Sequence, residues 1–94
     1  MMNYNSAVNI LGKAGFSITN KCHFDGETYH DFNSRKKDAS VSLVIDESTG
    51  SVSRIEVTTR KWDDKRHCYQ PVKENIYGLQ QLMDKFAPRK PMSL

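Results

Sequence analysis

Residues 39–62, with the sequence ASVSLVIDESTGSVSRIEVTTRKW, decide the fold that we expect for this chain. Apolar and polar side chains alternate through residues 39–46, and they alternate again through residues 54–59. A period of two residues is typical of β-strands that bury one face. With Gly50 as the left-handed last residue of a five-residue loop, the two segments form a β-hairpin at the centre of the chain.

The register of this central hairpin follows from its large aliphatic side chains. We expect Val44 to face Val52 and Val41 to face Ile55, because this pairing brings no like charges together within the hairpin. It also gathers the large aliphatic side chains on one face and leaves the Val44–Val52 pair alone on the other. The aliphatic face therefore needs a cover from the rest of the chain.

The segment before the central hairpin predicts a helix and a second hairpin. Residues 5–14 have the spacing of an amphipathic helix, and Gly15 follows where a left-handed residue commonly ends one. Residues 16–24 and 27–33 alternate like strands, and the Asp25-Gly26 pair between them is a strong hairpin signal.

The register of this first hairpin has two alternatives. A two-residue turn pairs Lys21 with His30 on the outer face, but it also turns Phe32 outward. A three-residue loop puts His30 opposite Cys22 and brings Phe32 onto the core face. We favour the second slightly because it buries an aromatic side chain worth about 2 kcal/mol, and a β-bulge would serve both.

The end of the chain predicts a loop followed by a second helix. Residues 63–68 are polar and lack a period, which is typical of a loop. We expect a helix over residues 71–87, with Pro71 in its first turn. Apolar side chains follow at spacings of four, three, four and three residues, at Val72, Ile76, Leu79, Met83 and Phe86. Of these, we expect Ile76, Leu79 and Met83 to be buried against the central hairpin. Residues 88–94 should form a flexible basic tail.

These elements define an α+β fold in the order αββββα. Two hairpins joined in one four-stranded antiparallel sheet need their apolar face covered, and the N-terminal and C-terminal helices supply the cover. We therefore expect a two-layer sandwich with both helices on one face and the other face open.

The composition indicates one small domain, residues 1–94. Fourteen Lys and Arg residues against eleven Asp and Glu residues give a net charge of +3, which indicates a polyanionic partner only if the charge is clustered. No apolar run approaches the roughly 18–20 residues of a membrane span, and the first residues do not resemble a signal peptide. We therefore expect a cytoplasmic protein without membrane contact, in which Cys22 and Cys68 are free thiols.

The histidine and cysteine residues do not form a recognisable catalytic or metal-binding motif. Cys22-His23 and His67-Cys68 are adjacent pairs, and adjacent residues on a strand point to opposite faces, so we expect no metal and no cofactor. General acid–base residues of a ribonuclease could be drawn from His23, His30, Asp31, Lys21 and Tyr29. Nothing in the sequence fixes their geometry, and we expect no catalytic residues and no enzyme.

One segment resembles a known family. Residues 10–18, ILGKAGFSI, followed by a hairpin that carries His30, look like the opening of HicA-type toxins, small ribonucleases with a double-stranded-RNA-binding-like fold. The resemblance covers about a quarter of the chain. The Gly, Ser and His cluster of that family is replaced here by residues 26–30, GETYH, so only His30 could be carried over as a functional residue.

Two basic clusters flank the central hairpin and indicate a binding surface. In the expected register Lys36 falls opposite Arg60, so both clusters meet at one end of the sheet. Like charges so placed repel each other, which an anionic partner would relieve. The residues that we expect to bind nucleic acid are Arg35, Lys36, Lys37, Arg54, Arg60, Lys61, Trp62, Lys65 and Arg66.

We therefore expect a small non-enzymatic protein that binds RNA or a ribonucleoprotein through this basic sheet end. The alternative is a protein-only interaction module, such as an inhibitor or an antitoxin-like adaptor, that docks on a host protein. A second alternative is a weak HicA-like ribonuclease. A phage-encoded host-takeover or counter-defence inhibitor would suit a chain of this kind, although that association rests on no particular residue. An outer edge strand and the Val44–Val52 pair also allow a homodimer.

Overall fold

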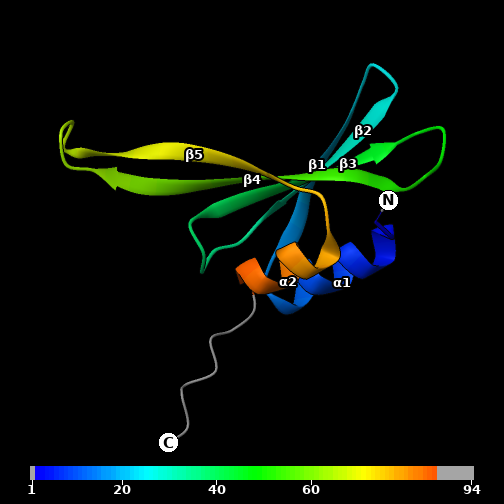
Figure 1. The fold of residues 1–94 in the computed structure, drawn as a ribbon, viewed down its shortest axis with the longest axis horizontal. Coiled ribbons are helices and arrows are strands. Elements are labelled where there is room, and N and C mark those ends of the chain that lie inside the picture. Colours follow the sequence, from blue (N-terminus) through cyan, green and yellow to red (C-terminus); the bar gives the residue numbers. More distant parts are fainter. Residues whose placement is uncertain (1, 87–94) are drawn as a thin grey trace, which may run out of the picture.

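The computed structural model describes residues 2–86, which form a five-stranded antiparallel sheet with two helices on one of its faces. The strands follow one another in chain order, β1-β2-β3-β4-β5, so the sheet is a simple meander (Figure 1). The elements are α1 (Tyr4–Lys13), β1 (Ser17–Phe24), β2 (Glu27–Asn33), β3 (Ala39–Asp46), β4 (Val52–Asp63), β5 (Cys68–Ile76) and α2 (Leu79–Phe86).

The expected α+β architecture, an antiparallel sheet with an N-terminal and a C-terminal helix, is confirmed, but the sheet has five strands rather than four. The error lies in residues 71–87, where strand β5 and the shorter helix α2 replace one long helix. Val72 and Ile76 are four residues apart, and this spacing keeps two side chains on one face of either a helix or a strand. Pro71 fits β5 because β5 is an edge strand, whose prolines need not donate to a neighbour.

A β-bulge corrects the register that we expected for the central hairpin. Val44 pairs with Arg54 and Ile45 pairs with Val52, so Ser53 is an extra residue in β4. The bulge resets the alternation of β4, and Val52 therefore lies in the core between the sheet and the helices rather than on the open face. Val41 accordingly faces Val57 rather than Ile55.

A second bulge resolves the two alternatives for the first hairpin. The turn is the two-residue Asp25-Gly26 turn, with Lys21 opposite His30, yet Phe32 is buried because the register shifts between Ile18 and Asn20. The positive φ angles of Asp25 and Gly26, 50° and 77°, fit a tight hairpin turn. Lys21 and His30 thus lie on the face that carries the helices, not on the open face.

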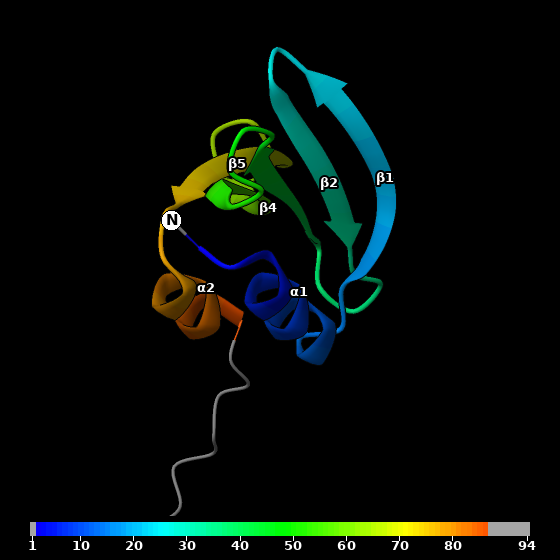
Figure 2. The same ribbon diagram turned by 90° about the vertical axis from the view of Figure 1, so that its right-hand side faces the viewer.

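The core lies between this face of the sheet and the two helices, which pack side by side beneath it (Figure 2). Helix α1 begins after Asn3, whose side chain accepts a hydrogen bond from the backbone N–H of Ser6. In α2, Leu82 is fully buried and Met83 is 46% exposed. Of the three residues expected to be buried near this helix, Ile76 is buried, Leu79 only partly so, and Met83 is exposed.

The long hairpin of β4 and β5 extends beyond the rest of the sheet. Strand β3 ends its pairing with β4 at Ala39 opposite Thr59, so residues 60–71 pair only with each other. We call residues 60–71 the arm. Figure 1 shows the arm projecting away from both helices, with the tip of the hairpin at the left. The arm replaces the loop that we expected at residues 63–68, where the structure has only a short turn between the strands.

The two remaining expectations concern the C-terminal tail and the absence of a membrane span. The basic tail expected at residues 88–94 lies outside the described residues. Within residues 2–86, no helix is long and apolar enough to span a membrane.

Candidate nucleic-acid interface

The open face of the arm carries alternating aromatic and basic side chains. Along β4 the residues on this face are Arg60 and Trp62, and their partners on β5 are Pro71 and Tyr69. These residues lie on the opposite face from Ile55 and Val57, which enter the core. All four side chains are exposed, so the arm offers them to a ligand.

Trp62 and Tyr69 form the aromatic centre of this surface. Their ring centroids lie 5.2 Å apart at an interplanar angle of 72°, an edge-to-face arrangement. The indole Nε1 of Trp62 donates a hydrogen bond to Asp64 Oδ1 at 2.7 Å, which fixes the orientation of the indole. Trp62 is 52% and Tyr69 61% exposed, so ring surface remains open for stacking.

The tip of the arm holds the remaining basic side chains in an ordered turn. Asp63 Oδ1 accepts hydrogen bonds from the backbone N–H groups of Lys65 and Arg66, at 2.9 and 3.3 Å. The arm contains four Lys and Arg residues and two Asp residues, which leaves a net charge of +2. Within residues 2–86 Lys61 and Lys65 form no ion pair, and Arg66 forms only a long one with Asp63, at 3.9 Å.

The first basic cluster lies in the connection between β2 and β3, next to the base of the arm. Lys36 is not opposite Arg60, as we expected, because β3 begins only at Ala39 and Arg60 pairs with Pro71 on β5. The two segments still meet, since Arg60 Nε lies 3.7 Å from an oxygen of Asp38.

Of the three basic side chains in that connection, two form no ion pair within residues 2–86 and one contacts helix α2. Arg35 and Lys36 are exposed and form no ion pair within residues 2–86. The Lys37 ammonium donates to the backbone carbonyl of Phe86 at 3.2 Å and lies 5.3 Å from the centre of its ring. Lys37 thus binds the last residue of α2, where a cation also interacts favourably with the helix dipole.

Arg54 lies far from the arm along the open face and is held by acidic neighbours. Its guanidinium contacts Glu27 and Glu56 at 3.1 and 3.0 Å and donates to Tyr29 Oη at 3.2 Å. Burial lowers the pKa of Arg54, but the hydrogen bonds and the two carboxylates outweigh burial and raise it. The contact between Arg54 and Tyr29 passes over Val44, which lies between them in the sheet and is fully buried although it is on the open face.

Two residues of the surface were missed by sequence reasoning. Tyr69 and Lys73 lie on the open face of β5, opposite Trp62 and Thr58. We expected Lys73 in a helix and assigned Tyr69 to no element, so no partner for Trp62 was defined. The signal that could have found them is the alternation of Tyr69, Pro71 and Lys73, which has the period of a strand.

His23 and His30 form a separate cluster on the helix-covered face of the first hairpin. His23 Nδ1 lies 2.7 Å from Glu47 Oε1, and the Thr28 hydroxyl donates to the same carboxylate oxygen at 3.0 Å. These hydrogen bonds lower the pKa of Glu47. His30 Nδ1 lies 2.8 Å from Tyr4 Oη.

Asp31 and Tyr29, which we listed with the histidines, lie on the other face of β2. Burial lowers the pKa of His30, and the charges of Lys21 and His23 add to that effect against an opposing contribution from Asp31. In the part of the chain that the structure describes, no three histidine, cysteine or acidic side chains are grouped to hold a metal ion. Cys22 and Cys68 are free and exposed.

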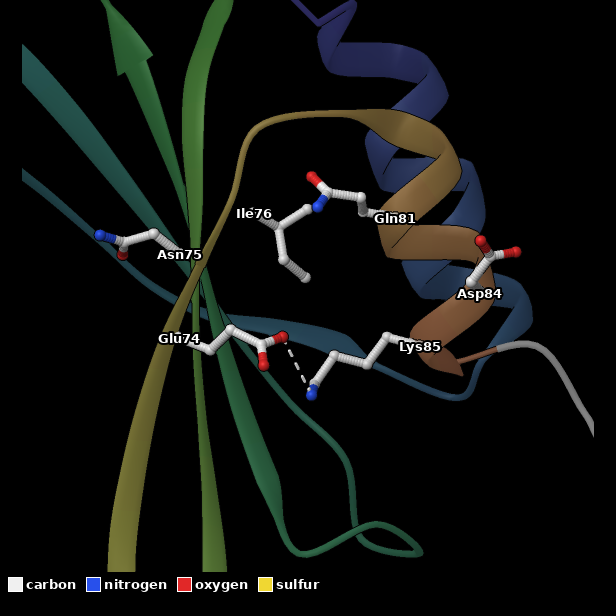
Figure 3. A pocket seen from close by; sticks show the side chains of 6 residues that line it. All are labelled: Glu74, Asn75, Ile76, Gln81, Asp84 and Lys85. Carbon is white, nitrogen blue, oxygen red and sulfur yellow. Dashed lines mark ion pairs between the residues drawn. The ribbon is translucent and has the colours of Figure 1, made fainter.

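A hollow of about 500 Å³ lies between β5 and α2 (Figure 3). Glu74 and Lys85 form an ion pair across it at 3.1 Å, and Asp84 adds a second carboxylate. Two carboxylates and one already paired ammonium make a poor site for a phosphate group. The hollow therefore does not extend the basic surface of the arm.

Comparisons with protein-family models, with curated proteins and with solved structures gave no match to this chain.

Proposed function

We propose that this protein binds single-stranded RNA through the arm. The observation that carries the proposal is the Trp62–Tyr69 pair, which is exposed on a projecting hairpin with Arg60 in the next row of the same face. Aromatic rings stack with unpaired bases, and exposed Lys and Arg side chains bind phosphates. The same surface could not stack bases that remain paired inside a duplex.

Titration with a fluorescently labelled single-stranded RNA in 50 mM salt tests this function. We expect saturable binding, and we expect the absorbance ratio at 260 to 280 nm of protein purified without nuclease to reveal bound nucleic acid. If the parent protein binds no RNA at 50 mM salt, the proposal is wrong. The protein-only alternative, in which the same exposed aromatic residues bind a host protein, would then be favoured.

Replacing Trp62 by alanine should weaken RNA binding by about 1–3 kcal/mol, because one base loses its stacking partner. The salt dependence of binding should stay the same, since no phosphate contact is removed. Fluorescence anisotropy at several salt concentrations measures both quantities. Tyr77→Ala is the matched control, because Tyr77 is also an exposed aromatic residue but lies outside the arm, and the binding of this variant should equal that of the parent. A Trp62→Ala variant that binds like the parent would exclude stacking on the arm.

A second candidate function, RNA cleavage, is favoured by one observation on the histidine cluster. His23 and His30 each form a hydrogen bond through Nδ1, to Glu47 and to Tyr4, and within residues 2–86 neither Nε2 takes part in a hydrogen bond or an ion pair. They are diagonal neighbours on adjacent strands, about 7 Å apart at Cβ. His30, with its lowered pKa, suits a general base, and His23, held by its hydrogen bond to Glu47, is placed to act as its partner.

In such a reaction the 2′-oxygen of RNA attacks phosphorus while His30 accepts its proton, and His23 protonates the leaving 5′-oxygen. If the cluster is catalytic, His30→Ala should lower the rate of RNA cleavage by roughly 10²–10⁴-fold. His67→Asn on the arm is the control, since asparagine tolerates the left-handed φ of 51° at that position. Equal cleavage by the parent and by His30→Ala would mean that the activity belongs to a contaminant.

A further inference from the structure

We propose that the RNA site is short and holds about four nucleotides, which run from the Trp62–Tyr69 pair to a hollow at the base of the arm. This inference rests on the proposed RNA binding and defines the length and the boundary of the site. Three observations carry it: the row of side chains along the arm, the hollow at its base, and a block of carboxylates immediately beyond.

The strand pairing orders the open face into successive rows. From the arm toward the centre of the sheet, Trp62 is paired with Tyr69, Arg60 with Pro71, and Thr58 with Lys73. A ligand strand that follows β4 therefore meets two aromatic rings, then a guanidinium, then a hydroxyl and an ammonium. One row that can stack a base is thus followed by two rows that can bind phosphates, and both kinds of contact hold single strands on proteins.

The hollow lies where the arm joins the sheet and has a volume of about 390 Å³. Arg60 lines it together with hydroxyl and amide groups from three segments of the chain, at Asn33, Ser34, Ser40, Thr58 and Thr59. Lys37 and Asp38 also line it, but Lys37 is bound to Phe86, and Asp38 lies 3.7 Å from Arg60. Ser40 and Asn33 already donate hydrogen bonds, to Asn33 and to Thr19. The hydroxyls of Ser34, Thr58 and Thr59 around the Arg60 guanidinium suit a phosphate or ribose group, whereas no aromatic ring lines the hollow to stack a base.

The next row of the open face ends the site. Glu56 pairs with Ser42, which in turn pairs with Asp31 on β2, so two carboxylates follow immediately after the Thr58 row. Glu27 adds a third, and Arg54 neutralises only part of this charge through its contacts with Glu27 and Glu56. Carboxylates repel the phosphates of a longer strand.

The length of the site follows from the geometry of the strand. Trp62 and Thr58 are four residues apart, which is about 13 Å along a β-strand. At about 3.4 Å for each nucleotide of a fully stacked strand, its most compact form, this distance holds at most about four nucleotides. We therefore expect a strand of four to fill the site, and additional nucleotides to project over the acidic block without gaining contacts.

Titration with unlabelled oligouridylates of two, four, six and ten nucleotides tests the inference. Trp62 is the only tryptophan in the chain, so quenching of its fluorescence reports binding at the arm directly. Affinity should rise between two and four nucleotides and then level off, apart from a statistical gain of about threefold for six nucleotides and about sevenfold for ten, which offer three and seven registers on a four-nucleotide site. Affinity that keeps rising steeply to ten nucleotides would overturn the short site and leave RNA binding intact. Absence of binding at every length would instead overturn the proposed function.

Two variants with opposite charge changes test the boundary. Thr58→Asp moves the acidic block one row toward the arm, and it should weaken the four-nucleotide strand by about tenfold or more while changing the two-nucleotide strand little. Asn9→Asp on α1 is the matched control and should bind every length like the parent. Glu56→Gln removes a carboxylate at the boundary and leaves Arg54 with one acidic partner, Glu27, so strands of six and ten nucleotides should gain affinity. An unchanged length dependence in both Thr58→Asp and Glu56→Gln would show that the carboxylates do not limit the site.

Discussion

Replacing Arg60 and Lys73, the two cations in the rows that follow the Trp62–Tyr69 pair on the open face, by glutamine should weaken RNA binding about 60-fold in 50 mM salt. Each phosphate contact contributes about −0.7 to the slope of log affinity against log salt for a single strand, so losing two flattens the slope by about 1.4. If the affinities of parent and variant become equal at 1 M salt, this change in slope gives the 60-fold difference in affinity at 50 mM. The ratio of the parent's affinity to the variant's affinity should fall about sevenfold between 50 and 200 mM salt. Titrations at four salt concentrations measure both effects.

A control with the same loss of charge separates local contact from net charge. Lys13 in α1 and Lys21 in β1 lie outside the arm, so Lys13→Gln combined with Lys21→Gln changes net charge equally. We expect this control to keep nearly the parent's slope. Arg60 and Lys73 are exposed, so their double variant should unfold at the same urea concentration as the parent. If the two double variants show the same slope of log affinity against log salt, the cations on the open face make no specific phosphate contacts and are only a solvated surface.

The second large effect concerns stability. Leu82→Ala should lower the free energy of unfolding by about 2–5 kcal/mol, because Leu82 is fully buried between α2 and the sheet and its loss leaves a cavity. This is a large part of the 5–15 kcal/mol that is typical of a whole domain. Urea unfolding followed by far-ultraviolet circular dichroism measures the change at 25 °C.

Met83→Ala is the matched control on the same helix. Met83 is 46% exposed, so its replacement should cost less than about 1 kcal/mol. Leu79→Ala should fall between the two, because Leu79 is only partly buried against the core. A Leu82→Ala variant as stable as the parent would contradict the packing of α2 on the sheet.

The periodicity of the sequence predicted β1 to β4 and α1 because those segments alternate or repeat without ambiguity. It did not predict how the strands pair, because Ser53 and Thr19 each add a residue that no partner opposes. A bulge moves every later side chain of its strand to the opposite face, and its position depends on packing across the sheet. Cys22 therefore faces the open side of the sheet although the alternation of β1 placed it in the core.

The candidate site was predicted in part. Arg60, Lys61, Trp62, Lys65 and Arg66 were identified as basic or aromatic residues near one sheet end, and the structure places all five on the arm. What the sequence did not reveal is that the arm projects, because that depends on β5 being a strand. Nor could it show that Lys37 and Arg54 are engaged within the fold, since their partners lie 49 and 27 residues away along the chain.

The edge strand β1 bears on how the sheet ends. All eight of its residues are exposed, and its outer backbone groups have no neighbouring strand within residues 2–86. Such an edge invites another chain to extend the sheet, and natural proteins discourage this with a bulge and with inward-pointing charges. The bulge at Thr19 and the positions of Lys21 and His23 on the helix-covered face supply both. A strand from a second molecule would have to pair with an irregular edge and lie alongside a lysine. The geometry of β1 therefore disfavours extension of the sheet by another chain.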